Sequence, residues 1–329
     1  MKAPPGLAHL VDQVLEVSVA GSFSRVGYAA RSRLEHWPDP PAQVHRVHLV
    51  TGASSGIGRA VATELGALGA EVWLVGRDEE RTKASAQAVR AAGGRAEVAV
   101  LDITDPQAVE ALCSRLAATH DRVHGLVHAA GALTRTYRTA ADGMELTVAT
   151  AVLGPFRLTA GLAPLLAASA ATIVTVSSGG MYAEPFDLAR LVSGPEDFSG
   201  VRAYARAKRA QVVLAHEWAR RLGPSGVASY ACHPGWVDTP GLATGLPHFA
   251  RLGPLLRTAA EGADTAAWLA AGGARVDGSM PATEGFFHDR RPRTEHRLRR
   301  TRRASAPDDG ARLWTWCEAA TRLHGDVAS

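Results

Sequence analysis

Residues 48–60, HLVTGASSGIGRA, constrain the fold of this chain more than any other stretch. They follow an apolar, strand-like run and open a segment whose apolar residues have helical spacing. Gly52, Gly56 and Gly58 allow a tight turn and let a pyrophosphate approach the backbone closely. The free N–H groups and the positive dipole end of the following helix favour the same anion. Some glycine-rich turns are only tight connections, but a strand before and a helix after predict nucleotide binding.

Strand-like and helix-like segments alternate along most of the chain. Continuous apolar strands between helices indicate a parallel sheet that is covered on both faces and joined by right-handed crossovers. We therefore predict an α/β fold, a doubly wound parallel Rossmann sheet of about seven strands with helices on both faces. The predicted strands are 44–50, 71–75, 96–101, 123–131, 171–178, 227–232 and 285–288.

Two flanks lie outside this single predicted domain, which spans residues 44–290. Residues 1–43 form an N-terminal helical extension that ends in a proline-rich break, and residues 291–329 combine a basic segment with an amphipathic helix. Each flank packs on the core or on a partner chain, or the first helix lies on a membrane surface. The apolar stripes that predict these helices are Leu7, Leu10, Val11, Val14 and Leu15 at the start, and Leu313, Trp316, Ala320 and Leu323 at the end.

The composition is that of a globular protein. Hydrophobic residues make up 46% of the 329 residues, which is enough for a sizeable core. The chain has no apolar run of about 18 residues and no secretory pattern at its N-terminus, so we expect neither a membrane span nor a cleaved signal. Cys113, Cys232 and Cys317 are far apart and fit neither a disulfide framework nor a metal cluster. We expect a cytoplasmic protein without a metal, with peripheral membrane association as the alternative.

The net charge of +4 has a local source. Eight arginines lie between residues 290 and 303, in RRPRTEHRLRRTRR. This run is a solvated tail, a belt against an acidic surface of the protein, or a contact with anionic lipid or nucleic acid. No interleaved aromatic platform and no known nucleic-acid-binding module accompany it, so we expect no nucleic-acid partner.

The glycine spacing points to a family. T-G-x-x-x-G-x-G, present as TGASSGIG (51–58), resembles the short-chain dehydrogenase/reductase family rather than the common G-x-G-x-x-G pattern. The ordered match covers about residues 44–290, and segments such as KRAQVVL and EGADTAAWLA also resemble one group of that family whose substrate is undefined. The other matching motifs are LDITD (101–105), HAAG (128–131), VSSGGMY (176–182), YARAK (204–208) and HPGWVDTP (233–240).

The segment YARAK contains the expected catalytic pair. Tyr204 and Lys208 are four residues apart and lie on one face of a predicted helix. A phenol with a pKa of about 10 is a poor base near neutral pH, and a nearby ammonium lowers that pKa. The resemblance implies that Tyr204 is the general acid and base, that Lys208 lowers its pKa and holds the nicotinamide ribose, and that Ser178 positions the substrate oxygen. Ser177 is then structural, and Tyr182 lacks a cation four residues later.

The sequence departs from the family pattern at one helix position and in one segment. Ala151 stands where the family has an asparagine that supports a water-mediated proton path to the lysine, and His128 and Ala129 replace two further asparagines. We expect His128 to be a hydrogen-bonded core residue rather than a catalytic one. The departures leave two alternatives open: an active enzyme that uses another proton path, or a nucleotide-binding sensor or scaffold with little or no turnover.

The end of the second strand indicates which nucleotide is preferred. Sites for NAD(H) often carry an acidic residue here, but the sequence has Gly76 followed by Arg77 and then Asp78. A guanidinium suits a 2′-phosphate, so we expect NADP(H), with NAD(H) as the alternative. The expected cofactor-binding residues are Gly52, Ser54, Ser55, Gly56, Ile57, Gly58, Arg77, Asp102, Ile103, Ala129, Gly131, Tyr204, Lys208, Pro234, Gly235, Val237 and Thr239.

Residues 241–258 are apolar and follow the predicted nicotinamide loop. In the family this segment closes over the substrate, whereas a short helix packed on the body is the alternative. We expect a hydrophobic carbonyl or alcohol as substrate, a surface loop over 183–200 beside it, and a homo-oligomer. The expected apolar lid residues are Leu242, Leu246, Phe249, Leu252 and Leu255.

Overall fold

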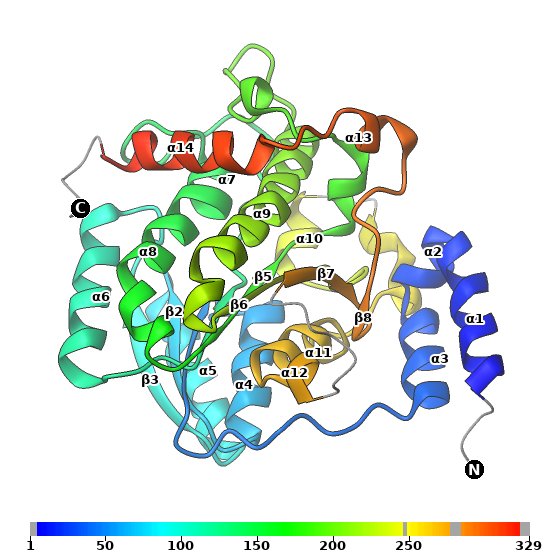
Figure 1. The fold of residues 1–329 in the computed structure, drawn as a ribbon, viewed down its shortest axis with the longest axis horizontal. Coiled ribbons are helices and arrows are strands. Elements are labelled where there is room, and N and C mark those ends of the chain that lie inside the picture. The colour runs from blue at the N-terminus through cyan, green and yellow to red at the C-terminus, as the bar shows by residue number, and fades with distance from the viewer. Residues whose placement is uncertain (1–4, 246–248, 277–283, 323–329) are drawn as a thin grey trace.

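The computed structural model describes residues 5–245, 249–276 and 284–322, and within them eight strands form one sheet (Figure 1). Their order is β3-β2-β1-β4-β5-β6-β7-β8, in which the first seven are parallel and β8 is antiparallel to β7. The predicted doubly wound sheet is confirmed, and it has one strand more than expected. The strands are β1 (Val47–Thr51), β2 (Glu71–Gly76), β3 (Arg95–Val100), β4 (Gly125–His128), β5 (Thr172–Val176), β6 (Ala228–Cys232), β7 (Glu284–His288) and β8 (Arg291–Pro292).

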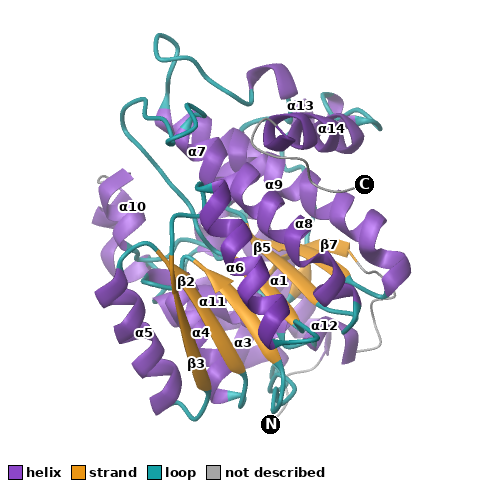
Figure 2. Cartoon of the chain, turned by 90° about the vertical axis from the view of Figure 1, so that its left-hand side faces the viewer, coloured by secondary structure: helices purple, strands orange, loops and turns teal. Residues whose placement is uncertain are grey.

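Helices cover both faces of the sheet because successive strand residues point to opposite sides (Figure 2). In β1, Leu49 packs into the core cluster beneath α6, α8, α9 and α14, and Val50 packs into the cluster beneath α4, α5, α11 and α12. The helices of the first layer are α6 (Pro106–Thr119), α8 (Gly154–Ala167), α9 (Gly200–Leu222) and α14 (Asp309–Arg322). Those of the second are α4 (Gly56–Ala67), α5 (Glu79–Ala91), α11 (Ala259–Ala270) and α12 (Gly273–Val276).

One helical stretch of the chain is long and apolar. Leu146–Ala167 is long and apolar enough to cross a bilayer by length and composition, but 78% of the relevant window is buried inside the protein. It comprises α7 (Leu146–Val148), a π-helical turn (Ala149–Leu153) and α8. The burial is that of a core helix, and α8 supplies Leu158 and Leu162 to the first core cluster.

The N-terminal extension forms three helices, α1 (Pro5–Val17), α2 (Val19–Phe23) and α3 (Arg25–Glu35), that lie beside β7 and β8 (Figure 1). The polar face of α1 is turned inward, so that Asp12 is 5% exposed while Leu10, Val14 and Val17 are 57%, 65% and 90% exposed. Of the predicted apolar stripe, Leu10 and Val14 therefore face outward, whereas Val11 and Leu15 are half-buried. The side chain of Leu7 lies outside the described residues.

The arginine run explains this orientation of α1. Arg293 contacts Asp12 at 2.6 Å, Arg297 pairs with Glu16, and Arg291 contacts Glu35 at 3.0 Å. Of the alternatives for this run, the belt against an acidic surface describes its first half. That surface is the extension for Arg291, Arg293 and Arg297, and Asp264 of α11 for Arg290. The remaining arginines, in and next to α13 (Arg299–Arg303), are exposed.

The hairpin between β7 and β8 was not predicted. Asp289 and Arg290 form its turn with φ values of 52° and 55°, a left-handed pair that matches the twist of a two-residue hairpin. The expected domain boundary after residue 290 falls inside this hairpin. The two-residue strand Arg291–Pro292 carries no periodic apolar signal, which is why the sequence did not reveal it.

The C-terminal helix packs on the body, as one of the expectations for this flank stated, and the predicted stripe residue Leu313 lies at the centre of the contact. Leu313 and Cys317 are fully buried in α14, and Trp314 packs against Trp218 with ring centroids 4.6 Å apart. The predicted stripe residues Trp316 and Ala320 lie at the edge of this contact, and Leu323 lies outside the described residues.

Candidate active site

A cavity of about 680 Å³ opens at the carboxyl ends of the parallel strands. All the predicted catalytic and cofactor-binding residues line it, because the segments that follow β1 to β6 converge at this edge of the sheet. Several lining residues were not predicted. Among them are Val19, Phe23, Thr51, Arg81, Leu133, Thr150 and Trp236.

The glycine-rich turn after β1 has a shape that only glycine permits. Gly52 has a φ of 69°, and a Cβ there would lie 2.8 Å from the backbone of Ala130. A Cβ on Gly58 would lie 2.4 Å from the carbonyl oxygen of Gly52. The backbone is thus as bare as a dinucleotide cradle requires, and the first turn of α4 offers N–H groups to an anion.

The hydroxyl of Thr51 joins this turn to the end of β4. Thr51 Oγ1 accepts hydrogen bonds from the backbone N–H groups of Ala129 and Ala130, each at 3.2 Å. These bonds hold the segment HAAG against the turn even though both family asparagines are replaced. His128 itself is buried, and its Nε2 lies 2.8 Å from Thr159 Oγ1. Burial lowers the pKa of His128 to about 3, so the ring is neutral and belongs to the core as expected.

At the far end of the cavity, Arg77 and Asp102 lie side by side. Arg77 Nη1 contacts Asp102 Oδ2 at 3.4 Å, and both side chains are largely accessible. A side chain at Gly76 would need Thr82 to move, because a Cβ there would lie 2.4 Å from Thr82 Oγ1. Asp78 caps α5 by accepting from the backbone N–H of Arg81 at 2.9 Å. The ambiguity that Asp78 introduced is thereby reduced, since its carboxylate is engaged in the helix cap.

The three predicted catalytic residues meet in the middle of the cavity. Ser178 follows β5, whereas Tyr204 and Lys208 lie on α9, and the Lys208 Nζ is 5.5 Å from the centre of the Tyr204 ring. Ser178 forms a hydrogen bond with Tyr204, and its Oγ accepts the backbone N–H of Gly180 at 3.1 Å. Ser177 points the other way and donates to the carbonyl oxygen of Lys208 at 2.8 Å.

Two effects of opposite sign act on the pKa of Tyr204. Burial raises the pKa of the Tyr204 phenol above its usual value, and only the hydrogen bond with Ser178 opposes that rise. The Lys208 ammonium donates to two acceptors, Val176 O at 2.7 Å and Gln211 Oε1 at 3.0 Å. Burial also lowers the pKa of Lys208 to about 8.

Gln211 is a site residue that the sequence analysis missed. Its Oε1 accepts from Lys208, and its Nε2 donates to the carbonyl oxygen of Ala151 at 2.8 Å. Ala151 lies in the π-helical turn, where Gly154 N–H bonds to Ala149 O five residues back. One amide therefore spans the space between the lysine and the helix position at which the family asparagine is missing. The signal in the sequence was a glutamine three residues after Lys208, on the same face of α9.

The Pro-Gly loop after β6 is held by Arg257. Gly235 has a φ of 80°, and a Cβ there would lie 2.5 Å from Arg257 Nε and 2.6 Å from the carbonyl oxygen of Phe23. Arg257 N–H donates to Trp236 O at 2.7 Å, and the guanidinium donates to Pro234 O at 3.3 Å. This loop therefore touches the N-terminal extension directly.

The predicted substrate segments fit the structure only in part. Leu242, in α10 (Pro240–Gly245), lines the cavity, but Leu252 and Leu255 do not, and Leu255 is 44% exposed. Leu246 and the side chain of Phe249 lie outside the described residues. The segment 183–200 is no simple surface loop, because it buries Phe186 and Leu191 in the core. In that segment only Ala183 lines the cavity, among the residues described. No group of three or more metal-ligating side chains occurs in the described part of the chain.

Comparisons with known proteins agree with this geometry. The family model described as short chain dehydrogenase matches residues 46–245. Dehydrogenase/reductase SDR family member 12 from Bos taurus is 36% identical over 297 residues, 88% of this chain and 91% of the relative. It represents the group that segments such as KRAQVVL resemble. Retinol dehydrogenase 12 from Homo sapiens is 33% identical over 250 residues, 74% of this chain and 78% of the relative.

A solved structure extends the comparison to the nucleotide. The crystal structure of a short-chain dehydrogenase from Burkholderia cenocepacia in complex with NADP has a TM-score of 0.60 and is 26% identical in sequence. The match covers 74% of this chain and 96% of that chain.

Proposed function

The chain belongs to the short-chain dehydrogenase family of NAD(P)-dependent oxidoreductases acting on CH–OH groups, and from this we propose that it reduces an apolar carbonyl compound with NADPH, or oxidises the matching alcohol. The observation that carries the proposal is the meeting of Ser178, Tyr204 and Lys208 in the cavity that the glycine-rich turn lines. The bare turn at Gly52 and Gly58 fits a dinucleotide pyrophosphate.

In this mechanism, Tyr204 Oη is the proton donor. Its raised pKa keeps the phenol protonated at neutral pH, which suits a group that gives a proton to a carbonyl oxygen. Ser178 Oγ accepts from Gly180 N–H, which fixes its position, and its hydroxyl can turn from Tyr204 to donate to the substrate oxygen. A bound nicotinamide would supply the hydride chemistry, and the positive charge of its oxidised form would favour the phenolate of Tyr204.

Lys208 supplies the charge of the site, and Gln211 positions it. With a pKa near 8, the ammonium is protonated at neutral pH and can turn from Val176 O toward a ribose hydroxyl. The amide of Gln211 links the ammonium to Ala151 O, where water would serve in the family pattern. The Gln211 amide holds Lys208 in place but does not carry protons. Tyr204 therefore regains its proton by a route that does not pass through Gln211.

We propose NADP(H) as the preferred nucleotide. Arg77 stands next to Asp102 at the far end of the cavity, and Gly76 has no acidic side chain that would bind a free 2′-hydroxyl. A guanidinium at this position matches a 2′-phosphate in charge and in geometry.

The competing function is a nucleotide-binding sensor or scaffold without turnover, and Tyr204→Phe separates the two. The enzyme loses carbonyl reduction by at least about a hundredfold, because general acid catalysis contributes on that order. NADPH binding, measured by nucleotide fluorescence, stays within about twofold, since the phenol hydroxyl is a proton donor rather than an anchor of the phosphates. A wild-type protein that binds NADPH but reduces no member of a broad carbonyl panel would favour the sensor.

We also propose weak association of α1 with a lipid surface. Leu10, Val14 and Val17 lie on its outer face and are more than half exposed, while its acidic residues are tied to the body. A helix with one apolar face outward and its polar face engaged can insert shallowly at the headgroup boundary.

A further inference from the structure

The N-terminal extension reaches the cavity through its shortest helix. Val19 and Phe23 are four residues apart on α2, so they lie on one face, and both line the cavity together with Ser178 and Tyr204. Phe23 is 3% exposed and lies deep in the wall, whereas Val19 is 47% exposed and lies toward solvent.

Phe23 stands directly beneath the turn that carries Ser178. A Cβ on Gly179 would lie 2.6 Å from Phe23 Cε2, so the ring occupies the space that a side chain next to Ser178 would need. The ring also meets His233 edge-on, with centroids 4.3 Å apart, and the backbone N–H of Trp236 donates to Phe23 O at 2.8 Å. The aromatic ring and its carbonyl thus touch both the Ser178 turn and the Pro-Gly loop.

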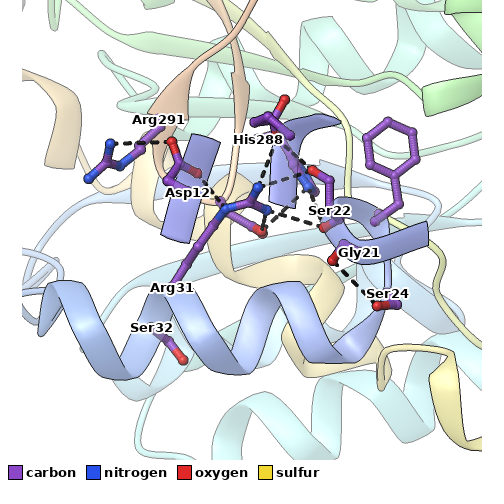
Figure 3. Close-up of polar contacts among 12 residues, drawn as sticks. Asp12, Gly21, Ser22, Ser24, Arg31, Ser32, His288 and Arg291 are labelled. Carbon is purple, nitrogen blue, oxygen red and sulfur yellow. Dashed lines mark hydrogen bonds and ion pairs between the residues drawn. The ribbon is translucent and has the colours of Figure 1, made fainter. Parts of the chain in front are cut away.

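Buried charges hold α2 in this place (Figure 3). Ser22 O, at the end of the helix, accepts from Arg31 at 3.2 Å and from Arg257 at 2.9 Å, and His288 Nε2 lies 3.2 Å away. The same two arginines grip Asp289, each with a contact of 2.6 Å. Cations at the carboxyl end of a helix are favourable, and here they are fixed by a buried carboxylate. These buried hydrogen bonds and ion pairs fix the position of α2 against the body.

We propose that α2 is the wall of the substrate compartment and that Val19 and Phe23 are specificity-determining residues, which set how long or bulky an apolar substrate can be. This inference rests on the proposed function, because it assigns the substrate end of the same cavity. The compartment is apolar: none of the described residues Val19, Phe23, Leu133, Ala183, Trp236 and Leu242 that line it is charged.

Val19 is the position to test, because its partial exposure lets it change without loss of the fold. We compare Val19→Trp and Val19→Ala with Val26→Trp, a control on α3 that is 57% exposed and does not line the cavity. The probes are straight-chain aldehydes from butanal to dodecanal, assayed with NADPH. The matching primary amides, which cannot be reduced, are titrated calorimetrically against the NADPH-loaded protein.

Val19→Trp narrows the wall, so kcat/KM for the longest aldehydes falls about tenfold or more while that for butanal changes about twofold or less. Val19→Ala moves the preference toward longer chains, and amide affinities follow the same order. Phe23→Leu, checked for folding by thermal unfolding, changes the preference near the reacting carbon, so branching next to the carbonyl is better tolerated.

Two outcomes separate the wall from the chemistry. If Val19→Trp and Val26→Trp have the same chain-length profile in turnover and in amide binding, the wall proposal is wrong. If the wild type binds amides with a length preference that Val19→Trp alters, yet reduces no aldehyde, the wall stands and the proposed reaction fails.

Discussion

At the scale of single residues, the site contains one substitution and its apparent replacement. Ala151 has lost the side chain that the family uses, and Gln211 reaches the same backbone position from the other side of Lys208. The ammonium, its acceptor and the carbonyl of Ala151 form one buried chain, in which Lys208 is 4% and Gln211 is 2% exposed. A buried amide that is bonded at both ends fixes its neighbours, and its loss leaves a donor or an acceptor unpaired.

Gln211 should therefore control the protonation of Lys208. Gln211→Leu removes an acceptor of the ammonium, so the pKa of Lys208 falls further below its usual value, whereas Gln211→Glu raises it. Because the protonated amine attracts the anionic nucleotide, NADPH affinity falls as pH rises through this pKa, near 8 in the wild type. That fall moves to lower pH in Gln211→Leu and to higher pH in Gln211→Glu.

The same variant reports on turnover. A hydrogen bond to a charged group contributes about 1.5 kcal/mol, so kcat/KM for Gln211→Leu falls about tenfold at pH 7. NADPH titrations from pH 6 to 10 measure the pH at which the affinity falls. Gln13→Leu is the control, because Gln13 lies in α1 and does not line the cavity. If NADPH affinity falls at the wild-type pH in both Gln211 variants, Gln211 does not position Lys208.

Arg77 is tested at the same scale. Arg77→Ala weakens NADPH binding by about tenfold or more and NADH binding by far less, because only NADPH carries the 2′-phosphate. Equal losses for the two nucleotides would refute the assignment. Arg115→Ala is the matched control, because Arg115 lies over the Trp73 ring and does not line the cavity.

At the scale of elements, the β7–β8 hairpin connects the N-terminal extension to the sheet. Its turn places Asp289 between Arg31 and Arg257, and all three side chains are 1% exposed. The apolar runs in the sequence predicted the seven parallel strands of the sheet, but they did not predict this hairpin. The turn residues Asp289 and Arg290 lack the Asn-Gly signature of such hairpins, and β8 is only two residues long.

Removing the carboxylate should cost more than any surface change. Asp289→Asn leaves the buried Arg257 without its carboxylate partner, whereas Arg31 keeps Asp12 and Glu16. Because an uncompensated buried charge is costly, the free energy of unfolding falls by about 3–5 kcal/mol. Burial alone would raise the pKa of Asp289, but Arg257 and Arg31 hold it below its usual value. The stabilisation from this carboxylate is thus complete above the unfolded pKa of about 3.9 and is lost as pH falls through the lower folded value.

Urea unfolding at pH 7 and in acid measures both effects. In Asp289→Asn the stability is lower at pH 7 and depends less on pH in the acid range. Glu79→Gln, which breaks the exposed pair with Lys83, is the control and leaves stability unchanged. An Asp289→Asn protein as stable as the control would show that the network around α2 is dispensable.

At the scale of the whole molecule, the sequence located the Rossmann domain and the residues that line its cavity. Both flanks pack on the body, which was one of the expectations, but the inner face of α1 was not foreseen. Motif order fixes which segments meet at the carboxyl edge of a parallel sheet, so Ser178, Tyr204 and the glycines could be named in advance. The inner face of α1 could not be predicted from periodicity, because its apolar stripe is split: Leu10 and Val14 are exposed, whereas Val11 and Leu15 are half-buried. The complementary clue was long-range: an arginine run that needed acids, and Asp12 and Glu16 one helical turn apart.

The outward face of α1 gives the prediction at this scale. The wild type should co-float with anionic liposomes, and a Leu10→Ser, Val14→Ser, Val17→Ser variant should not. Each buried aliphatic side chain contributes about 1.5 kcal/mol or more, so binding falls by about a hundredfold or more. Because the contact is apolar, it persists at high salt. Val44→Ser, Val100→Ser, Val192→Ser, an equal change on other surfaces, is the control, and a wild type that does not float contradicts the proposal.

The ion pairs between α1 and the arginine run also have a consequence for synthesis of the chain. Asp12 leaves the ribosome about 280 residues before its partner Arg293, and Arg31 some 258 before Asp289. Until translation is nearly finished, the extension has no docking site, and the compartment beside Ser178 lacks a side. Assembly of the catalytic chamber is thus a final, post-translational event, and truncated chains present an undocked leader to cellular proteolysis.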